Sequence, residues 1–407
     1  NDPDYYYYRA GVKVKLKDFK GAIEDYSRVI KLDPKNYWAF HNRGEAKNNI
    51  SDFKGAESDF AEALKINSQF LWSYVQRAYM RSKNGDHINA IEDFDNAIRI
   101  DPKKDFLFNS RGFSKSQTGD YIGAIKDLSS ALSLDPNNEQ SYLSRAYYKT
   151  QIGDFKGALS DYSAAINIDP LDPESYISRA WTNFNLGDYS QANVDYEKVL
   201  EIGNPIQKLD SIISLIENNF MLSNLSKVPE LIEKAKPLLN QSDNKEKETI
   251  LLYAESRYYI NIGNLNKSEE LAKKCLAKTN DSIYVNACSS ILSNIYIDNK
   301  DYDKAKKFIK FRTYEGQLSL AYIAFMEKKL QKAERILKRI YKRQFNIENF
   351  KRPDPYLSSM VGSTLWFQGK NKEAKFFHEE SLEIYKSIYG EKHPYLIQPY
   401  ILSLIHI

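Results

Sequence analysis

Two nearly identical stretches follow one another in this chain. Residues 111–136 read RGFSKSQTGDYIGAIKDLSSALSLDP, and residues 145–170 read RAYYKTQIGDFKGALSDYSAAINIDP. The same register recurs six times at a constant interval, with an alanine at the same place in each copy: Ala22, Ala56, Ala90, Ala124, Ala158 and Ala192. A fixed period of this length indicates an array of repeated structural units rather than one closed domain.

Each repeat has the pattern of two helices separated by a short turn. Apolar and small residues recur at helical spacing on both sides of "TGD" at 118–120, where glycine ends one helix and aspartate suits the start of the next. Pro136 stops the second helix. The small side chains of Gly112 and Ala124 would let the paired helices approach closely. We therefore predict an all-α fold with six regular hairpins over residues 1–204.

This pattern resembles the tetratricopeptide repeat (TPR), a helix–turn–helix unit of the same period. The resemblance covers residues 5–204 as six consecutive units, because the small, aromatic, Gly-Asp and Pro positions recur in one register. It implies a right-handed superhelix, or α-solenoid, in which the first helix of each unit lines a concave groove. One hairpin cannot bury its apolar face alone, so neighbouring hairpins would supply the core.

The period loosens after Gly203. Five segments still have the pattern of second helices, at 225–239, 263–276, 300–309, 328–337 and 369–382. We therefore interpret residues 205–400 as about five degenerate TPR-like hairpins, which brings the solenoid to about eleven. The stretch HEESLEIYKSIYGEKHPYL at 378–396 resembles the longer repeats of kinesin light chains and of bacterial repeat proteins that carry a caspase-like domain.

The composition and the chain ends give expectations about membrane insertion, the last residues and the cysteines. No apolar run approaches the roughly 18 residues that cross a bilayer, and we favour a cytoplasmic location. Residues 401–407 end in LSLIHI, which matches a translated sequencing adapter, so we interpret them as a non-native tail. Cys275 and Cys288 are too few for a disulfide framework, and their apolar helical contexts favour reduced core thiols.

An arginine precedes the small residue of the first helix in all six units, and an aspartate follows that arginine by sixteen residues. The arginines are Arg9, Arg43, Arg77, Arg111, Arg145 and Arg179, and the aspartates are Asp25, Asp59, Asp93, Asp127, Asp161 and Asp195. One interpretation is a ladder of arginines that binds a polyanion. We favour an ion pair between the two helices of each unit, because each arginine has its own aspartate and the row offers no net charge.

The sequence contains no recognised catalytic or cofactor motif. A phosphate loop, a dinucleotide fingerprint, a nucleophile elbow and zinc-binding spacings are all missing, and the five histidines are scattered. We predict a chain that is not an enzyme and needs no cofactor or metal.

The predicted groove carries the stronger indication of function. In the family, positions 2, 5 and 9 of the first helix face the concave side. When these positions are mapped onto this sequence, position 2 corresponds to Trp38, Trp72 and Phe106. Position 9 corresponds to Tyr79, Phe113, Tyr147 and Trp181. Position 5 corresponds to His41, Val75, Asn109, Leu143 and Ile177. Such a ring-rich surface with little charge suits peptide binding. The alternative is that some rings only brace adjacent first helices.

Charge is distributed unevenly along the chain. Residues 1–204 carry 26 basic and 30 acidic side chains, whereas residues 300–352 carry 16 basic and 6 acidic ones. Five of these cations are predicted to share one helix face: Lys328, Lys332, Arg335, Arg339 and Lys342. A solvated helix face is the simpler interpretation. The alternative is a docking patch for an acidic protein, a nucleic acid or an anionic lipid surface.

These patterns together predict a scaffold for protein–protein interaction, which binds a peptide or helical segment of a partner in its concave groove. The alternative is a sensor or regulatory array of a larger protein whose effector domain, such as a caspase-like protease, lies beyond residue 400. The sequence does not identify the partner.

Overall fold

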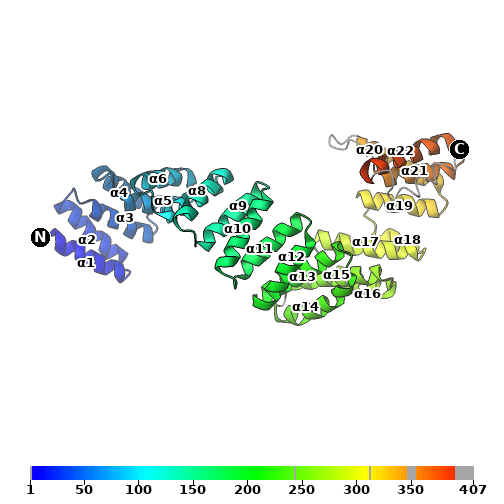
Figure 1. Cartoon of the computed structure of the whole chain (residues 1–407), viewed down its shortest axis with the longest axis horizontal. Coiled ribbons are helices and arrows are strands. Elements are labelled where there is room, and N and C mark those ends of the chain that lie inside the picture. Colours follow the sequence, from blue (N-terminus) through cyan, green and yellow to red (C-terminus); the bar gives the residue numbers. More distant parts are fainter. Residues whose placement is uncertain (1, 243, 311–312, 346–353, 390–407) are drawn as a thin grey trace. The chain divides into compact units, whose positions relative to one another are not determined.

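The computed structural model describes residues 2–242, 244–310, 313–345 and 354–389. Over these ranges the chain forms 22 α-helices, one short 3-10 helix and no β-strand (Figure 1). It divides into two compact units, Asn1–Ser223 and Asn224–Ile407, which we call the N-terminal unit and the C-terminal unit. The predicted all-α solenoid fold is confirmed. Residues 401–407, the predicted non-native tail, lie outside the described ranges.

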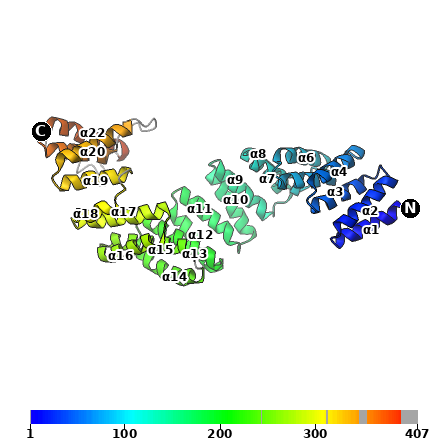
Figure 2. The same cartoon turned by 180° about the vertical axis from the view of Figure 1, so that it is seen from behind.

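Six successive hairpins and one further helix make up the N-terminal unit. The hairpins are α1 (Pro3–Lys15) with α2 (Phe19–Leu32), α3 (Tyr37–Asn49) with α4 (Phe53–Ile66), α5 (Leu71–Lys83) with α6 (His87–Ile100), α7 (Asp105–Gln117) with α8 (Tyr121–Leu134), α9 (Glu139–Gln151) with α10 (Phe155–Ile168), and α11 (Pro173–Asn185) with α12 (Tyr189–Ile202). α13 (Pro205–Met221) packs on α12 and α11. Each hairpin packs on the next, as both views show (Figures 1 and 2).

The C-terminal unit continues as paired helices of less regular length. Its elements are η1 (Leu225–Lys227), α14 (Val228–Ser242), α15 (Lys245–Asn261), α16 (Leu265–Lys278), α17 (Ser282–Asp298), α18 (Tyr302–Phe308), α19 (Tyr314–Met326), α20 (Leu330–Phe345), α21 (Pro355–Trp366) and α22 (Asn371–Tyr389). α15 packs on α16, α17 on α18, α19 on α20 and α21 on α22. The five predicted second-helix segments fall on α14, α16, α18, α20 and α22. The resemblance of 378–396 to kinesin light chains stays a prediction.

A residue with positive φ followed by an aspartate forms the turn within each hairpin; the first of the two is a glycine in the last four hairpins and Lys17 or Ser51 in the first two. Gly119 adopts a φ of +86°, a left-handed conformation that glycine reaches at no steric cost. Asp120 then caps α8, because its carboxylate accepts a hydrogen bond from the backbone N–H of Gly123 at 2.8 Å. An aspartate caps the second helix in the same way in all six hairpins.

Small residues set the distance between the two helices of a hairpin. The repeated alanine of the second helix, Ala124 in the fourth hairpin, is completely buried in every unit. A Cβ atom added to Gly112 on α7 would lie 3.3 Å from the backbone oxygen of Ala124 and 3.4 Å from the Cβ atom of Asp127. The backbones therefore pack at a separation that larger side chains would increase.

The six predicted arginine–aspartate ion pairs are all present, with nitrogen–oxygen distances of 2.5 to 2.7 Å. Each aspartate is almost fully buried. In the first five hairpins a second cation, four residues after the arginine, bonds to the same carboxylate: Lys13, Lys47, Arg81, Lys115 and Lys149. Our sequence analysis missed these cations, although their constant spacing from one hairpin to the next could have revealed them. Each arginine is bonded to its own buried aspartate, so the row lacks the unpaired cations that a polyanion-binding ladder needs.

The arginine also joins neighbouring hairpins. Arg111 bonds to Asp95 on the preceding second helix at 2.6 Å, and it lies over the ring of Phe108 at 5.6 Å. In three other hairpins a serine takes the place of Asp95 and bonds to the arginine at 3.0 Å. One side chain therefore connects three helices and fixes the stacking of adjacent hairpins.

Replacing Asp127 by asparagine should destabilise the N-terminal unit by about 2–4 kcal/mol, because Arg111 and Lys115 would lose the buried carboxylate that balances them. The matched control is Asp95→Asn, which removes the exposed carboxylate bonded to the same arginine and should cost about 1 kcal/mol or less. Chemical denaturation of both variants checks the difference. Equal losses would show that burial of Asp127 is not decisive.

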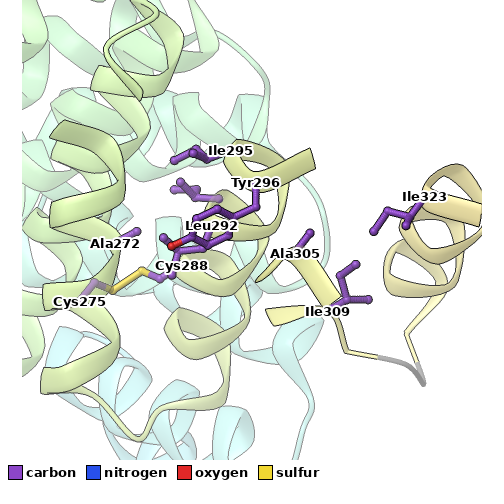
Figure 3. Packing of buried hydrophobic residues seen from close by; sticks show 10 residues of the cluster. Ala272, Cys275, Cys288, Leu292, Ile295, Tyr296, Ala305, Ile309 and Ile323 are labelled. Carbon is purple, nitrogen blue, oxygen red and sulfur yellow. A yellow bond between two sulfur atoms is a disulfide. The ribbon is translucent and has the colours of Figure 1, made fainter. Parts of the chain in front are cut away.

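The expectation of reduced cysteines is wrong. Cys275 on α16 and Cys288 on α17 form a disulfide, and both are completely buried beside Ala272 and Leu292 (Figure 3). The cysteines are 13 residues apart and their Cα atoms are 6.6 Å apart, because the turn between α16 and α17 brings the packed faces of the two helices together. Sequence analysis placed both residues in apolar helices but could not show that their side chains meet.

Reducing this disulfide should lower the free energy of unfolding of the C-terminal unit by about 3 kcal/mol, the effect of opening a loop of this size in the unfolded chain. Cys275→Ala together with Cys288→Ala should show the same loss without a reductant. Thiol titration of denatured, unreduced protein checks the bond itself. Two reactive thiols before reduction would restore our first expectation.

Candidate functional site

Four half-exposed aromatic rings form a periodic row on the first helices of the N-terminal unit. The exposed fractions are 40% for Tyr79 on α5, 50% for Phe113 on α7, 53% for Tyr147 on α9 and 50% for Trp181 on α11. These residues occupy position 9 of four consecutive units. They are not buried between helices, so they are available to a ligand.

The first two rings border a hollow of about 790 Å³ across α5, α7 and α9. Most of the remaining lining is uncharged and polar: Ser82, Asn109, Ser110, Gln117, Asn138, Gln140, Ser141 and Ser144. Lys83 and His87 are the only residues of basic type in the described lining, which contains no carboxylate. We call this hollow the amide hollow.

The other two rings border a second hollow across α9, α11 and α13. Its further lining consists of Thr150, Gln151, Tyr162, Ile177, Ser178, Tyr196, Asp210, Ser211 and Ser214. Asp210 is the only charged residue in this described lining. We call this hollow the acidic hollow.

The rings at position 2 lie apart from both hollows. Trp72 and Phe106 are nearly parallel, with ring centroids 6.4 Å apart and an interplanar angle of 5°. Trp38 contacts Phe70 at 4.5 Å between ring centroids. Trp38 and Trp72 are exposed, whereas Phe106 packs partly against the core that contains Leu107.

Position 5 is less open than we expected. His41 and Val75 are buried, which corrects the prediction that both face the groove. Position 5 packs against position 3 of the next first helix, where Ser73 bonds to the His41 ring at 3.0 Å. Burial also lowers the pKa of His41 to about 4, which keeps the ring uncharged at neutral pH. Asn109 remains half-buried in the amide hollow.

Some side chains of this surface also contact the adjacent first helix and hold the two helices together. The Tyr79 hydroxyl lies 3.1 Å from the Ser110 hydroxyl on the next first helix, and the Tyr79 ring contacts Phe94. The Asn109 side-chain oxygen accepts a hydrogen bond from Ser141 at 2.8 Å, also on the next first helix. These polar bonds fix the spacing of the helices while they leave the Tyr79 ring exposed.

The predicted basic patch lies on α20 of the C-terminal unit. All five of its cations are exposed, and Ala333, Leu337 and Ile340 on the opposite face are buried. Lys328 precedes α20 with a φ of 61°, so it belongs to the turn and not to the helix face. The remaining cations, Lys332, Arg335, Arg339 and Lys342, lie on α20 itself.

Carboxylates do not balance this face. Glu334, the only acidic residue of α20, bonds to Lys338 at 2.9 Å and to Lys370 at 2.8 Å. Within the described ranges, the patch cations Arg335 and Arg339 form no ion pair. They line a shallow hollow that also contains Lys342 and Arg343.

Neither a metal-binding cluster nor a membrane-spanning helix is present among the described residues. No group of three or more histidine, cysteine, aspartate or glutamate side chains there could hold a metal ion. None of the described helices combines the length and the apolar character that crossing a membrane requires.

The fold and the repeat geometry define a class of helical repeat proteins. A family model described as TPR repeat matches residues 10–48, and two models described as tetratricopeptide repeat match residues 73–104, 173–202 and 359–395. The first three matches fall on hairpins of the N-terminal unit and the last on α21 and α22. The chain therefore contains tetratricopeptide repeats.

Several solved structures of repeat proteins are similar to this chain. A tetratricopeptide repeat protein from Parabacteroides merdae is 16% identical, with 71% of this chain and 98% of its own length covered and a TM-score of 0.43. The C-terminal part of a TPR repeat-containing protein from Cytophaga hutchinsonii is 14% identical, with coverage of 69% and 98% and a TM-score of 0.48. YrrB, described as a TPR protein with an unusual peptide-binding site, is 17% identical, with coverage of 44% and 92% and a TM-score of 0.40. No curated protein matches the chain.

Proposed function

We propose that the N-terminal unit is a scaffold that binds a segment of a protein partner along the groove formed by α5, α7, α9 and α11. The observation that carries this proposal is the row of four half-exposed rings beside two hollows. Aromatic rings contribute strongly to interface hot spots, because they bury large apolar areas with few rotatable bonds to order.

The amide hollow favours an extended segment over a helix. Its asparagine and glutamine side chains can both donate and accept hydrogen bonds. An extended peptide offers free backbone N–H and C=O groups for these side chains, whereas a bound helix has already paired most of its own. Serine hydroxyls along the same lining add further partners.

Replacing Phe113 and Tyr147 together by alanine should weaken partner binding by about 2 kcal/mol or more, because both rings are hot-spot candidates. The helical signal in circular dichroism should barely change, since both side chains are half-exposed. The measurement is calorimetric titration with a binding peptide selected from a random library.

The matched control is Ile122→Ala together with Ile88→Ala, which removes two strongly exposed apolar side chains from second helices, outside both hollows. This variant should bind the peptide as the unmodified protein does. The proposal fails if the ring variant binds normally. It also fails if that variant unfolds, because the rings would then be part of the core.

The α20 face supports a second candidate function, docking of an acidic protein segment. Arg335 and Arg339 are one helical turn apart and have no carboxylate partner in the described ranges. The apolar face of α20 is buried in the protein, so it is not available for insertion into a lipid surface. No aromatic ring lies in the described lining to stack on nucleic-acid bases.

Arg335→Gln together with Arg339→Gln should abolish binding of a poly-glutamate probe to the whole chain at low salt, because the uncompensated charge is lost. The control is Lys273→Gln with Lys274→Gln on α16, an equal charge change at lysines that are already paired with Glu269 and Glu270. Fluorescence anisotropy checks both variants. Tighter binding of single-stranded DNA than of poly-glutamate would favour the nucleic-acid alternative and contradict this candidate.

A further inference from the structure

We propose that the outer face of α1 is a docking site for an amphipathic helix of a partner protein. Four large side chains at helical spacing make up this face, and all four are exposed: Tyr5, Tyr8, Val12 and Leu16. We call them the α1 stripe. The stripe lies outside both hollows, so this docking site is separate from the groove.

The equivalent positions of the later first helices are covered by the preceding hairpin. Tyr5 and Val12 occupy positions 3 and 10 of their unit and are 59% and 56% exposed. In the five later units every residue at these two positions is buried: Ala39, Ser73, Leu107, Ser141 and Ser175 at position 3, and Ala46, Met80, Ser114, Tyr148 and Thr182 at position 10. Met80 packs with Phe60 of α4, for example, and Tyr148 with Leu128 of α8. In the described ranges no hairpin precedes α1, so the surface that stacking buries elsewhere is open on this helix.

Arg9 also differs from the later arginines in its third contact. In four of the five later units the arginine bonds to a serine or an aspartate on the preceding second helix, at 2.6 to 3.0 Å. Arg9 instead donates to the hydroxyl of Tyr5 on its own helix, at 3.4 Å. Its side chain is 40% exposed, compared with 14–25% for the other five arginines. A helix docked on α1 could supply the shorter bond from a hydroxyl or a carboxylate.

The second helices that contact the later arginines define the chemistry of the partner. Each presents an apolar side chain, then the serine or aspartate that bonds to the arginine, and another apolar side chain three residues further on. The four sets are Tyr26, Ser27 and Ile30; Phe94, Asp95 and Ile98; Leu128, Ser129 and Leu132; and Tyr162, Ser163 and Ile166. Residues at this spacing share one face of a helix. We therefore expect a partner helix with the same pattern.

A second copy of the chain is a less suitable occupant of the α1 stripe. The four helices with this pattern, α2, α6, α8 and α10, already pack on α3, α7, α9 and α11 of their own chain. Direct pairing of two α1 helices would bring the two copies of Arg9 close together, because Arg9 lies between Tyr8 and Val12 near the middle of the stripe, and like charges repel. A separate protein that supplies a serine or a carboxylate has neither disadvantage.

The probe for this site is a fluorescein-labelled copy of residues 87–100, the second helix that carries Asp95. An isolated helix of this length is marginal in water, so a hydrocarbon staple on the opposite face holds it helical. We expect the peptide to bind the whole chain, as measured by fluorescence anisotropy. Asp95→Asn in the peptide should weaken binding roughly two- to five-fold, because the carboxylate partner of Arg9 is lost.

Val12→Asp in the protein should weaken binding of this peptide roughly ten-fold or more, because docking would then bury a carboxylate in the apolar stripe. The matched control is Val194→Asp on α12, which makes the same change at a valine that is 57% exposed and lies outside the stripe. The control should bind the peptide as the unmodified protein does. Both variants should keep the thermal unfolding of the unmodified chain, since both positions are exposed.

Four outcomes would contradict the proposal. It fails if the peptide does not bind the unmodified chain, or if Val12→Asp binds it normally. Equal losses in Val12→Asp and Val194→Asp would show that added charge, not the stripe, decides binding. Equal binding of the two peptides would remove the contact with Arg9 on which the chemistry of the partner rests. Self-association of the chain that Val12→Asp abolishes, seen by sedimentation velocity, would assign the stripe to a second copy instead.

The same probe separates this site from the groove. Replacing Phe113 and Tyr147 by alanine should leave binding of the stapled peptide unaltered, because neither ring belongs to the α1 stripe. A loss in that variant would place the peptide in the groove and overturn the docking site on α1.

Discussion

The buried aspartate of each hairpin is the constraint on which the N-terminal unit depends. Asp127 is 2% exposed, and a carboxylate in that position needs compensating charge, which Arg111 and Lys115 provide from the first helix. Arg111 also reaches Asp95 of the preceding hairpin. The same group therefore ties two helices into a hairpin and one hairpin to the next. This repeated geometry places position 9 at regular intervals along the array.

The pairing of the arginines with buried aspartates determines which side chains the first helices expose. Because each arginine of the array is paired with a buried aspartate, the first helices present rings, amides and hydroxyls around the two hollows instead of a row of cations. The C-terminal unit uses charge differently. On α20 the cations Arg335 and Arg339 are exposed and have no carboxylate partner in the part of the chain that the structure describes. Cations thus serve packing in the N-terminal unit, whereas those of α20 remain on the surface.

Features that recur at every period could be predicted from the sequence, and features set by a single contact could not. The hairpins, the Arg111–Asp127 pair and the exposed rings each recur at the period of the repeat, so their spacing alone indicates a shared place in the fold. The disulfide of Cys275 and Cys288 occurs once and depends on how α16 meets α17. The burial of His41 depends on a serine in the next unit, a neighbour that no single-unit pattern reveals.

The sixth hairpin departs from the array at the point where the acidic hollow forms. Asn183 on α11 stands where the first five hairpins have a lysine or arginine, so Arg179 alone pairs with Asp195 in the described ranges. This hairpin therefore holds one inward cation fewer than its neighbours, two residues along α11 from Trp181. The set of buried charges that ties each of the first five hairpins together therefore changes in the last hairpin of the array.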